Sequence, residues 1–353
     1  MIITGKYPSL RLRRTRQHDW SRRLVQENNL SSSDLILPIF LTEGKNKKIP
    51  IKSMPGIFRY SINNLGFIVE KAIKRKIPMV ALFPYTNPKV KNLIGSESLN
   101  ENNLVCRAIR YIKSRYKNNI GVMCDVALDP YTSHGHDGIL KKNIILNDES
   151  IKILAQQAFL QASMGCDVIA PSDMMDGRIK IIREKLDKEN LQNVQIISYA
   201  AKYASSYYGP FRDAIGSKKA LKGDKKTYQM DFRNQSESLR EVALDIKEGA
   251  DFVMVKPGLP YLDIIKSIRE NFKIPVFAYQ VSGEYSMIIK AIKNGILPSA
   301  VKMPKVKTKI VYNEKEFALI GYQTKFRYQL GQKVKIKVHS VDLERKQMDF
   351  ILV

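Results

Sequence analysis

Two lysines end short apolar segments, and a lysine in such a position can act as a nucleophile. Lys256 follows the run 252–255, whose Phe, Val and Met residues are typical of a strand buried on both faces. Lys202 comes soon after a second apolar run, 194–198. Ligands of α/β proteins bind where the carboxyl ends of parallel strands meet. We therefore expect each lysine to have an apolar wall behind it and an open mouth in front.

If these two strands are neighbours, their ammonium groups face each other. Each positive charge disfavours protonation of the other, and burial adds to the effect, so the pKa of the amine falls. A free amine can form a Schiff base with a ketone. The alternative for Lys256 is a strand-end lysine that extends its ammonium group to solvent along apolar surface. The presence of two such lysines, Lys202 and Lys256, favours nucleophilic chemistry.

Carboxylates follow two other predicted strands, in the stretches 124–138 and 170–178. At the mouth of a sheet, carboxylates can transfer protons or bind a substrate ammonium group. A hydrogen-bonded turn without a ligand is the alternative for the first stretch. The candidates are Asp125, Asp129, Asp137 and Asp173.

A long polar segment runs from residue 208 to residue 229. It is too long and too polar for a simple connection, and loops of this kind commonly act as lids. Arg212 and Lys225, which lie in it, could bind a substrate carboxylate.

The elements that position these residues alternate along the chain from residue 34. Strand, helix, strand in this order indicates parallel βαβ units. Seven apolar runs predict the α/β class and a (β/α)8 barrel of TIM type that lacks its eighth unit, which closure requires. The expected strands are 35–41, 79–83, 121–126, 168–170, 194–198, 252–255 and 276–278, and the expected helices include 104–116, 150–164 and 238–248.

Three segments are expected. Residues 1–33 form a polar, basic arm without a core of its own, either disordered or docked on another subunit, and Trp20 favours docking. Residues 34–297 form the barrel. Residues 298–353 form a β-rich tail, because Val and Ile alternate with Lys at a strand's period of two in 333–338.

Composition sets the class of protein. The chain has 353 residues, 44% of them hydrophobic and 26% charged, which is typical of a globular protein. Its net charge of +25 permits nucleic-acid partners, but the lysines are scattered, which favours a solvated surface. The three cysteines have no ligand or disulfide spacing. Without a signal peptide or a membrane-spanning run, a cytoplasmic location is expected.

The chain resembles the family of δ-aminolevulinic acid dehydratases, also called porphobilinogen synthases, over about residues 10–296. Besides the arm RLRRTR, six segments in family order carry the resemblance: DVALDPYTSHGHDGI, APSDMMDGRI, SYAAKYASSYYGPFRDA, KTYQMDF, FVMVKPGLPYLDI and FAYQVSGEY. The resemblance implies the condensation of two 5-aminolevulinate molecules to porphobilinogen, a step of tetrapyrrole and heme biosynthesis.

The resemblance also implies roles for residues. Both lysines form Schiff bases, Lys256 with the substrate that becomes the propionate side and Lys202 with the one that becomes the acetate side. The second site would contain Ser172, Asp173, Arg212, Lys225 and Gln229. The first site would contain Phe211, Tyr279 and Ser282.

For the metal, the resemblance separates two branches. Zinc-dependent members carry three cysteines at positions that here are Ala127, Asp129 and Asp137, so we do not expect catalytic zinc. In the aspartate-rich branch, Mg²⁺ binds away from the chemistry, near the glutamate that matches Glu241, and favours an active homo-octamer. The alternative for Glu241 is an ordinary exposed helix glutamate.

We expect the resemblance to this family to end at about residue 296. The family's last strand and a tyrosine that caps a substrate carboxylate are not visible there. The tail resembles instead part of the RNA-binding β-barrel of ribonuclease R-type exoribonucleases. The alternative function is therefore a non-catalytic or RNA-associated protein that has lost activity together with the eighth barrel unit.

Overall fold

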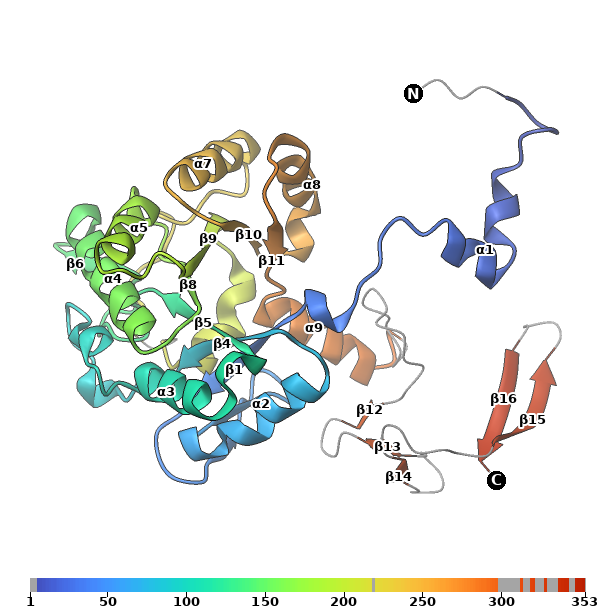
Figure 1. Cartoon of the computed structure of the whole chain (residues 1–353), viewed down its shortest axis with the longest axis horizontal. Coiled ribbons are helices and arrows are strands. Elements are labelled where there is room, and N and C mark those ends of the chain that lie inside the picture. Colours follow the sequence, from blue (N-terminus) through green and yellow to red (C-terminus); the bar gives the residue numbers. More distant parts are fainter. Residues whose placement is uncertain are drawn as a thin grey trace.

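A sheet of nine strands forms the centre of the molecule, in the order β11-β10-β9-β8-β5-β4-β1-β3-β2 (Figure 1). The computed structural model describes residues 5–217 and 220–297, together with short strands between residues 312 and 352. Seven of the nine strands are parallel to their barrel neighbours. They are β1 (Ile36–Leu41), β4 (Met79–Pro84), β5 (Gly121–Val126), β8 (Val168–Pro171), β9 (Gln195–Lys202), β10 (Phe252–Lys256) and β11 (Val276–Ala278).

A helix follows each of these strands, and most of the helices cover the outside of the sheet (Figure 1), whereas α6 packs against the cluster inside the barrel. This confirms the predicted α/β class and the barrel of βα units. The helices are α2 (Leu65–Lys74), α3 (Leu104–Tyr116), α4 (Asn147–Ser163), α5 (Arg178–Lys188), α6 (Gly209–Ala214), α7 (Gln235–Lys247), α8 (Leu262–Asn271) and α9 (Ser282–Lys293).

Alternate residues of each barrel strand pack on opposite faces of the sheet, as the strand period of two requires. Phe40, Phe83 and Met254 belong to a buried cluster inside the barrel. Ile39 and Leu82, which alternate with them, pack in the layer between the sheet and the outer helices. This double burial explains why the strands appear in the sequence as continuous apolar runs.

Within the described residues, no strand connects β11 to β1, so strand pairing does not close the barrel there. The expected lack of an eighth unit stays a prediction, because residues 298–311 lie outside the described residues. A short strand, β3 (Phe58–Tyr60), pairs with the carboxyl end of β1 instead, and β2 (Lys48–Pro50) pairs antiparallel with β3.

The loop between β2 and β3 bridges the open side by hydrogen bonds. The Tyr285 hydroxyl of α9 donates to the Pro55 carbonyl at 2.6 Å, and the Ser286 hydroxyl donates to the Ser53 carbonyl at 2.8 Å. The Arg59 guanidinium donates to the carbonyls of Asp213 and Ala214, at the end of α6. Side chains therefore connect the two sides of the barrel where a strand is absent.

Several elements were not predicted. A hairpin of β6 (Ile139–Lys141) and β7 (Ile144–Leu146) precedes α4, and α6 lies in the segment expected to be a loop. Strand β9 continues to Lys202, four residues beyond its predicted end at 198. The small residues after Tyr199 have a low strand propensity, but pairing with β10 keeps them in the sheet.

The amino-terminal arm stands apart from the barrel (Figure 1). It contains a 3-10 helix (Leu12–Arg16) and α1 (Asp19–Leu24), and Trp20 is 61% exposed. The expected role of residues 1–33 in assembly stays a prediction. None of the helices in the described part of the chain has the length and apolar character that a membrane span requires.

The tail contains two antiparallel groups of strands. One group is β12 (Tyr312–Asn313), β13 (Ala318–Ile320) and β14 (Arg327–Tyr328), and the other is β15 (Ile336–Asp342) and β16 (Gln347–Leu352). The rest of residues 298–353 lies outside the described residues, and with it the expected likeness to an RNA-binding barrel. The division into three segments stays a prediction.

A buried carboxylate fixes α9 to the turn after β10. Glu284 is fully buried and accepts hydrogen bonds from the backbone amides of Leu259 and Val281, both at 2.6 Å. We expect Glu284→Ala to lower the free energy of unfolding by about 3 kcal/mol, because two buried amides lose a charged acceptor, and Glu284→Gln to lower it by about half as much. Urea denaturation measures both changes.

The matched control is Glu270→Ala on α8, whose exposed ion pair with Lys266 spans 3.7 Å. Its effect should be below about 0.5 kcal/mol. Equal effects of the substitutions at positions 284 and 270 would contradict the anchoring role.

Candidate active site

The two lysines lie directly opposite each other on neighbouring strands. Lys202 ends β9, Lys256 ends β10, and the two residues are register partners in the parallel pair. Only 5% of Lys202 and 4% of Lys256 is exposed. The structure thus brings the two amines together at the carboxyl ends of the strands, the edge at which sequence analysis expected them.

Aromatic rings surround the Lys256 amine. The Nζ atom lies 4.4 Å from the ring centre of Tyr279 and 5.0 Å from those of Phe211 and Tyr199. Tyr208 lies 5.5 Å away. Burial and the neighbouring Lys202 charge lower the pKa of Lys256 to about 7. A large fraction of this amine is therefore neutral, and nucleophilic, at neutral pH.

The surroundings of Lys202 are polar. Its Nζ donates to the Ser172 carbonyl and lies 3.6 Å from Asp137 Oδ2. Lys225 reaches the same carboxylate, with Nζ at 2.7 Å from Asp137 Oδ1 and at 3.3 Å from Asp129 Oδ2. Aromatic rings thus surround the Lys256 amine, whereas charged groups lie around the Lys202 amine.

The four buried charged groups Lys202, Lys225, Asp129 and Asp137 interact electrostatically with one another. Burial acts to raise the pKa of Asp137, but the Lys202 and Lys225 charges overcome it and hold that pKa below its usual range. Burial raises the pKa of Asp129 in spite of Lys225. The pKa of Lys225 is raised because the two carboxylates outweigh its burial. Lys225 and Asp137 are consequently a charged pair, and Asp129 holds its proton more tightly.

Two more aspartates, Asp125 and Asp173, belong to the cluster of charged groups around the lysines. Asp125, at the end of β5, is half-buried, and burial raises its pKa against the charges of Lys256 and Lys202. Asp173 follows β8 and is fully buried, and burial raises its pKa to about 7 in spite of the nearby Arg178 charge. Asp173 therefore exchanges its proton near neutral pH.

The segment predicted as a lid covers the loop after β5. His136 Nε2 is 2.7 Å from the Lys222 carbonyl, and its Nδ1 is 3.1 Å from the Tyr228 hydroxyl. The Lys222 amide donates to the His134 carbonyl at 3.2 Å. Gly135 has φ +73, and a Cβ there would lie 2.8 Å from the Leu221 nitrogen, so only glycine permits this contact.

Four other predicted residues form no hydrogen bond or ion pair with either lysine amine in the described part of the chain, and three of them lie near the site. Ser282 begins α9, where its hydroxyl donates to the Tyr207 carbonyl at 3.4 Å. Gln229 is buried beside Lys225 in the lid segment. Arg212 is half-buried on α6. Glu241 is half-buried on α7, outside the strand ends.

Sequence reasoning missed Tyr199 and Tyr208 as neighbours of Lys256. Tyr199 lay beyond the predicted end of its strand at 198, although its alternation with Ser198 could have placed it inside the barrel. Tyr208 is buried, and its hydroxyl donates to the carbonyls of Tyr203 and Lys256 at 2.7 and 3.1 Å. No local pattern indicates that contact, because it joins residues 48 positions apart.

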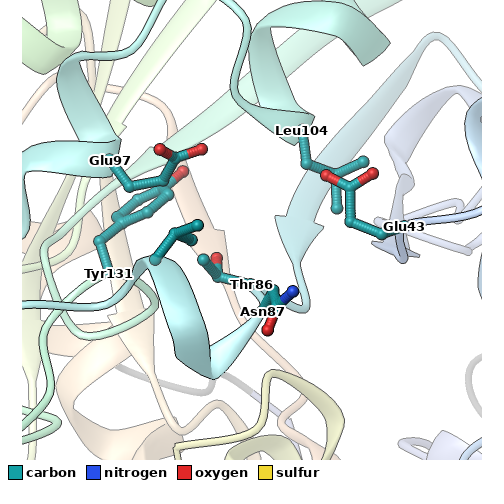
Figure 2. Close-up of a pocket in the computed structure, with 7 residues that line it drawn as sticks. Glu43, Thr86, Asn87, Glu97, Leu104 and Tyr131 are labelled. Atoms are coloured by element: carbon teal, nitrogen blue, oxygen red, sulfur yellow. The ribbon is translucent and has the colours of Figure 1, made fainter.

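A separate cavity of about 140 Å³ opens among the loops after β1, β4 and β5. Figure 2 shows Glu43 and Leu104 on one side of it and Glu97 and Tyr131 on the other. The Thr86 hydroxyl lines this cavity and has no hydrogen-bond partner among the described residues. Neither lysine lines it, so this cavity is distinct from the lysine site.

Thiolate-bound zinc does not fit the residues present. Cys106, Cys124 and Cys166 are all buried, and burial raises the pKa of Cys106 to about 11 and that of Cys124 as well. The raised pKa values of Cys106 and Cys124 favour their protonated forms, whereas zinc binds thiolates. The loop after β5 offers carboxylates but no sulfur.

A hydrated magnesium ion fits the surroundings of Glu241. Within the described residues, no three His, Cys, Asp or Glu side chains are close enough to enclose a metal ion. Magnesium, however, keeps several waters and needs only one or two carboxylates. Burial raises the pKa of Glu241, Arg178 opposes this, and three nearby carboxylates add to it: Asp245, Asp176 and Glu237. A cation there would relieve their repulsion.

The low pKa of Lys256 can be measured without substrate. We expect its reaction with acetic anhydride to reach half of its maximal rate near pH 7, and Lys202→Met to move this midpoint upward, because a neighbouring positive charge is removed. Mass spectrometry of the labelled peptide follows the reaction, with exposed lysines as internal controls. An unchanged or lower midpoint in the variant would show that the two amines are not coupled.

Comparisons with known proteins agree with this geometry. The family model described as "Delta-aminolevulinic acid dehydratase" matches residues 9–310, past residue 296, where we expected the likeness to end. The delta-aminolevulinic acid dehydratase of Bradyrhizobium diazoefficiens is 58% identical over 289 residues, which are 82% of each chain. That of Rhodobacter capsulatus is 46% identical over 300 residues, covering 84% of this chain and 89% of the relative.

A solved structure extends the likeness to three dimensions. The crystal structure of the Toxoplasma gondii enzyme in complex with its reaction product porphobilinogen superposes with a TM-score of 0.80 and 45% identity, and the match covers 82% of both chains. None of these matches is to a ribonuclease. The chain belongs to the delta-aminolevulinic acid dehydratase family.

Proposed function

We propose that this chain is a porphobilinogen synthase, which condenses two 5-aminolevulinate molecules to porphobilinogen with loss of two water molecules. The observation that carries the proposal is the pair of buried lysines in direct register on β9 and β10. Membership of the family supports it, as does the porphobilinogen bound to the Toxoplasma gondii relative.

Lys256 is the nucleophile of the first site. Its neutral amine attacks the ketone carbon of one substrate, and water leaves as the Schiff base forms. Phe211 and Tyr279 lie against this amine and exclude water from it, which favours the neutral form. Ser282, at the start of α9, completes this site.

Lys202 forms the second Schiff base, in the ionic half of the site. Lys225, together with Arg212, binds the carboxylate of the second substrate, and Asp129 and Asp137 hold Lys225 in position. Ser172 and Gln229 line the same half. The lid segment excludes water from both halves when it rests on His136.

Proton transfer is the task of the aspartates. Formation of the pyrrole ring removes protons from substrate carbon and nitrogen, and the departing oxygens take up protons. Asp173, with a pKa of about 7, can both donate and accept a proton at neutral pH. Asp125, beside both lysines, is a second candidate for this transfer.

For the metal we propose Mg²⁺ at Glu241 rather than zinc. The carboxylates around Glu241 would hold the hydrated ion, whose charge would stabilise this part of α7. The ion lies outside the lysine site in this proposal, so its effect is on the enzyme's assembly and not on a chemical step.

A homo-octamer formed through the arm and a cytoplasmic location are part of the proposal and stay predictions. The RNA-associated alternative depends on residues 298–353, which lie largely outside the described residues, and no observation favours it over the enzyme.

Borohydride trapping tests the reaction. We expect 5-aminolevulinate plus borohydride to modify Lys256 and Lys202, because both amines would form Schiff bases. Lys256→Arg or Lys202→Arg should lower product formation by about 10³-fold or more, as for the loss of a nucleophile. A colorimetric assay for porphobilinogen and peptide mass spectrometry give the two measurements. Unmodified lysines in folded protein would refute the proposal.

Metal removal tests the cofactor. We expect EDTA to reduce porphobilinogen formation and Mg²⁺ to restore it, whereas Glu241→Gln should lose this response and still form the Schiff base at Lys256. Size-exclusion chromatography reports whether the assembly changes in parallel. Restoration by zinc but not by magnesium would contradict the choice of metal.

A further inference from the structure

A buried arginine, Arg178, lies beside the Lys202 half of the site and next to Asp173. Arg178 is the first residue of α5 and is 2% exposed. A guanidinium without access to water needs partners for its charge and its five N–H groups. The two edges of the Arg178 guanidinium differ: one is hydrogen-bonded, and the Nε edge is not.

One edge of the guanidinium is held firmly. Nη2 donates to Asp245 Oδ2 at 3.0 Å and to the Ser198 hydroxyl at 3.2 Å, and Nη1 approaches Asp245 Oδ1 at 3.4 Å. The Ser198 hydroxyl donates in turn to Asp245. Asp245 is also buried. This bidentate contact fixes the plane of the guanidinium.

The other edge faces Asp173 without bonding to it. Arg178 Nε lies 3.9 Å from Asp173 Oδ2, and neither atom has a hydrogen-bond partner within the described residues. The second oxygen, Oδ1, accepts from the Met175 amide at 2.8 Å. An unpaired donor and an unpaired acceptor, both buried and about one ångström beyond hydrogen-bonding distance, can form a hydrogen bond after a small movement.

The loop that carries Asp173 is constrained on both sides. Met174 has φ +66, a conformation that costs a non-glycine residue energy and persists only where surrounding contacts hold it. The carbonyl of Ser172, on the other side of Asp173, accepts from Lys202 Nζ. Arg178 thus holds one end of a short turn whose other end contacts the Schiff-base lysine.

We propose that Arg178, oriented by Asp245 and Ser198, is a positioning residue that holds Asp173 beside Lys202 and forms a bond to Oδ2 only when that oxygen has lost its proton. This inference rests on the proposed function for the use of Asp173 in proton transfer. In the neutral state Oδ2 is free to donate its proton to substrate. In the ionised state Arg178 Nε stabilises the carboxylate until the proton returns.

The charges around the pair give the sign of the effect. Asp173 is faced by Arg178 from α5 and by Lys202 from β9, and both favour its ionised form, while burial disfavours it. Arg178 is faced in turn by Asp245, Glu241 and Glu248 from the α7 side. Loss of the guanidinium should therefore raise the pKa of Asp173.

The test reads the Asp173 proton directly. The infrared band of a protonated buried carboxyl is followed against pH in substrate-free protein, and the signal that Asp173→Asn removes belongs to Asp173. In the double variant Arg178→Met with Asp245→Leu, which removes both partners of the bidentate ion pair together, we expect the midpoint to rise by about one pH unit or more. Arg178→Lys, which keeps the charge, should leave it nearer to that of the wild type.

Kinetics supply the second readout. The pH profile of kcat should shift in the same direction as the infrared midpoint, and Arg178→Lys should recover part of the activity that the double variant loses. Schiff-base trapping at Lys256 and the thermal unfolding midpoint report folding, and Ser198→Ala serves if the double variant does not fold. Activity that falls only in proportion to stability, with an unmoved midpoint, would overturn the proposal.

The proposed function and the positioning role of Arg178 can fail separately in these experiments. A wild-type protein that forms no porphobilinogen refutes the proposed function, while the infrared midpoint still decides the positioning role. An active wild type with an unmoved midpoint in the variants refutes the positioning role alone.

Discussion

Two ammonium groups on neighbouring strands, both removed from water, are the constraint on which the rest of the site depends. The direct register of Lys202 with Lys256 places like charges close together where solvent cannot screen them. One of the two must lose its proton easily, or carboxylates must compensate for both. In the structure Lys256 has a lowered pKa, and a carboxylate lies beside Lys202.

The two halves of the site differ in what lies against each amine. Rings of Tyr199, Phe211 and Tyr279 surround Lys256, and burial together with the Lys202 charge lowers its pKa to about 7. Lys202 has Asp137 within 3.6 Å. One fold thereby gives two identical side chains different chemistry, as an asymmetric condensation of two identical substrates requires. Arg178 adds a further buried charge to the ionic half, next to Asp173.

The incomplete barrel around this site is compatible with a well-packed interior. Strand pairing does not connect β11 to β1 within the described residues, yet Tyr285 and Arg59 bond across the opening. Buried backbone groups must find partners, and side-chain and loop contacts can supply them where a strand is absent. The lysine strands β9 and β10 lie inside the sheet, each with a neighbour on both sides, so the opening does not expose them.

The sequence by itself predicted the seven strands, the helices at 104–116, 150–164 and 238–248 and the two lysines near strand ends, because strand burial on both faces and helical periodicity are local patterns. It also identified the aspartates, since strand ends share one edge of a parallel sheet. Only the tertiary structure decided that Lys202 and Lys256 are register partners, that Tyr208 and Tyr199 border Lys256, and that Arg178 faces Asp173. The lysine register and the Tyr208 contact join residues distant in the chain, and the place of Tyr199 depends on how far its strand extends. The contact between Arg178 and Asp173 is close in the chain, but it depends on the bonds of Arg178 to Asp245 and Ser198. No local pattern encodes these tertiary contacts.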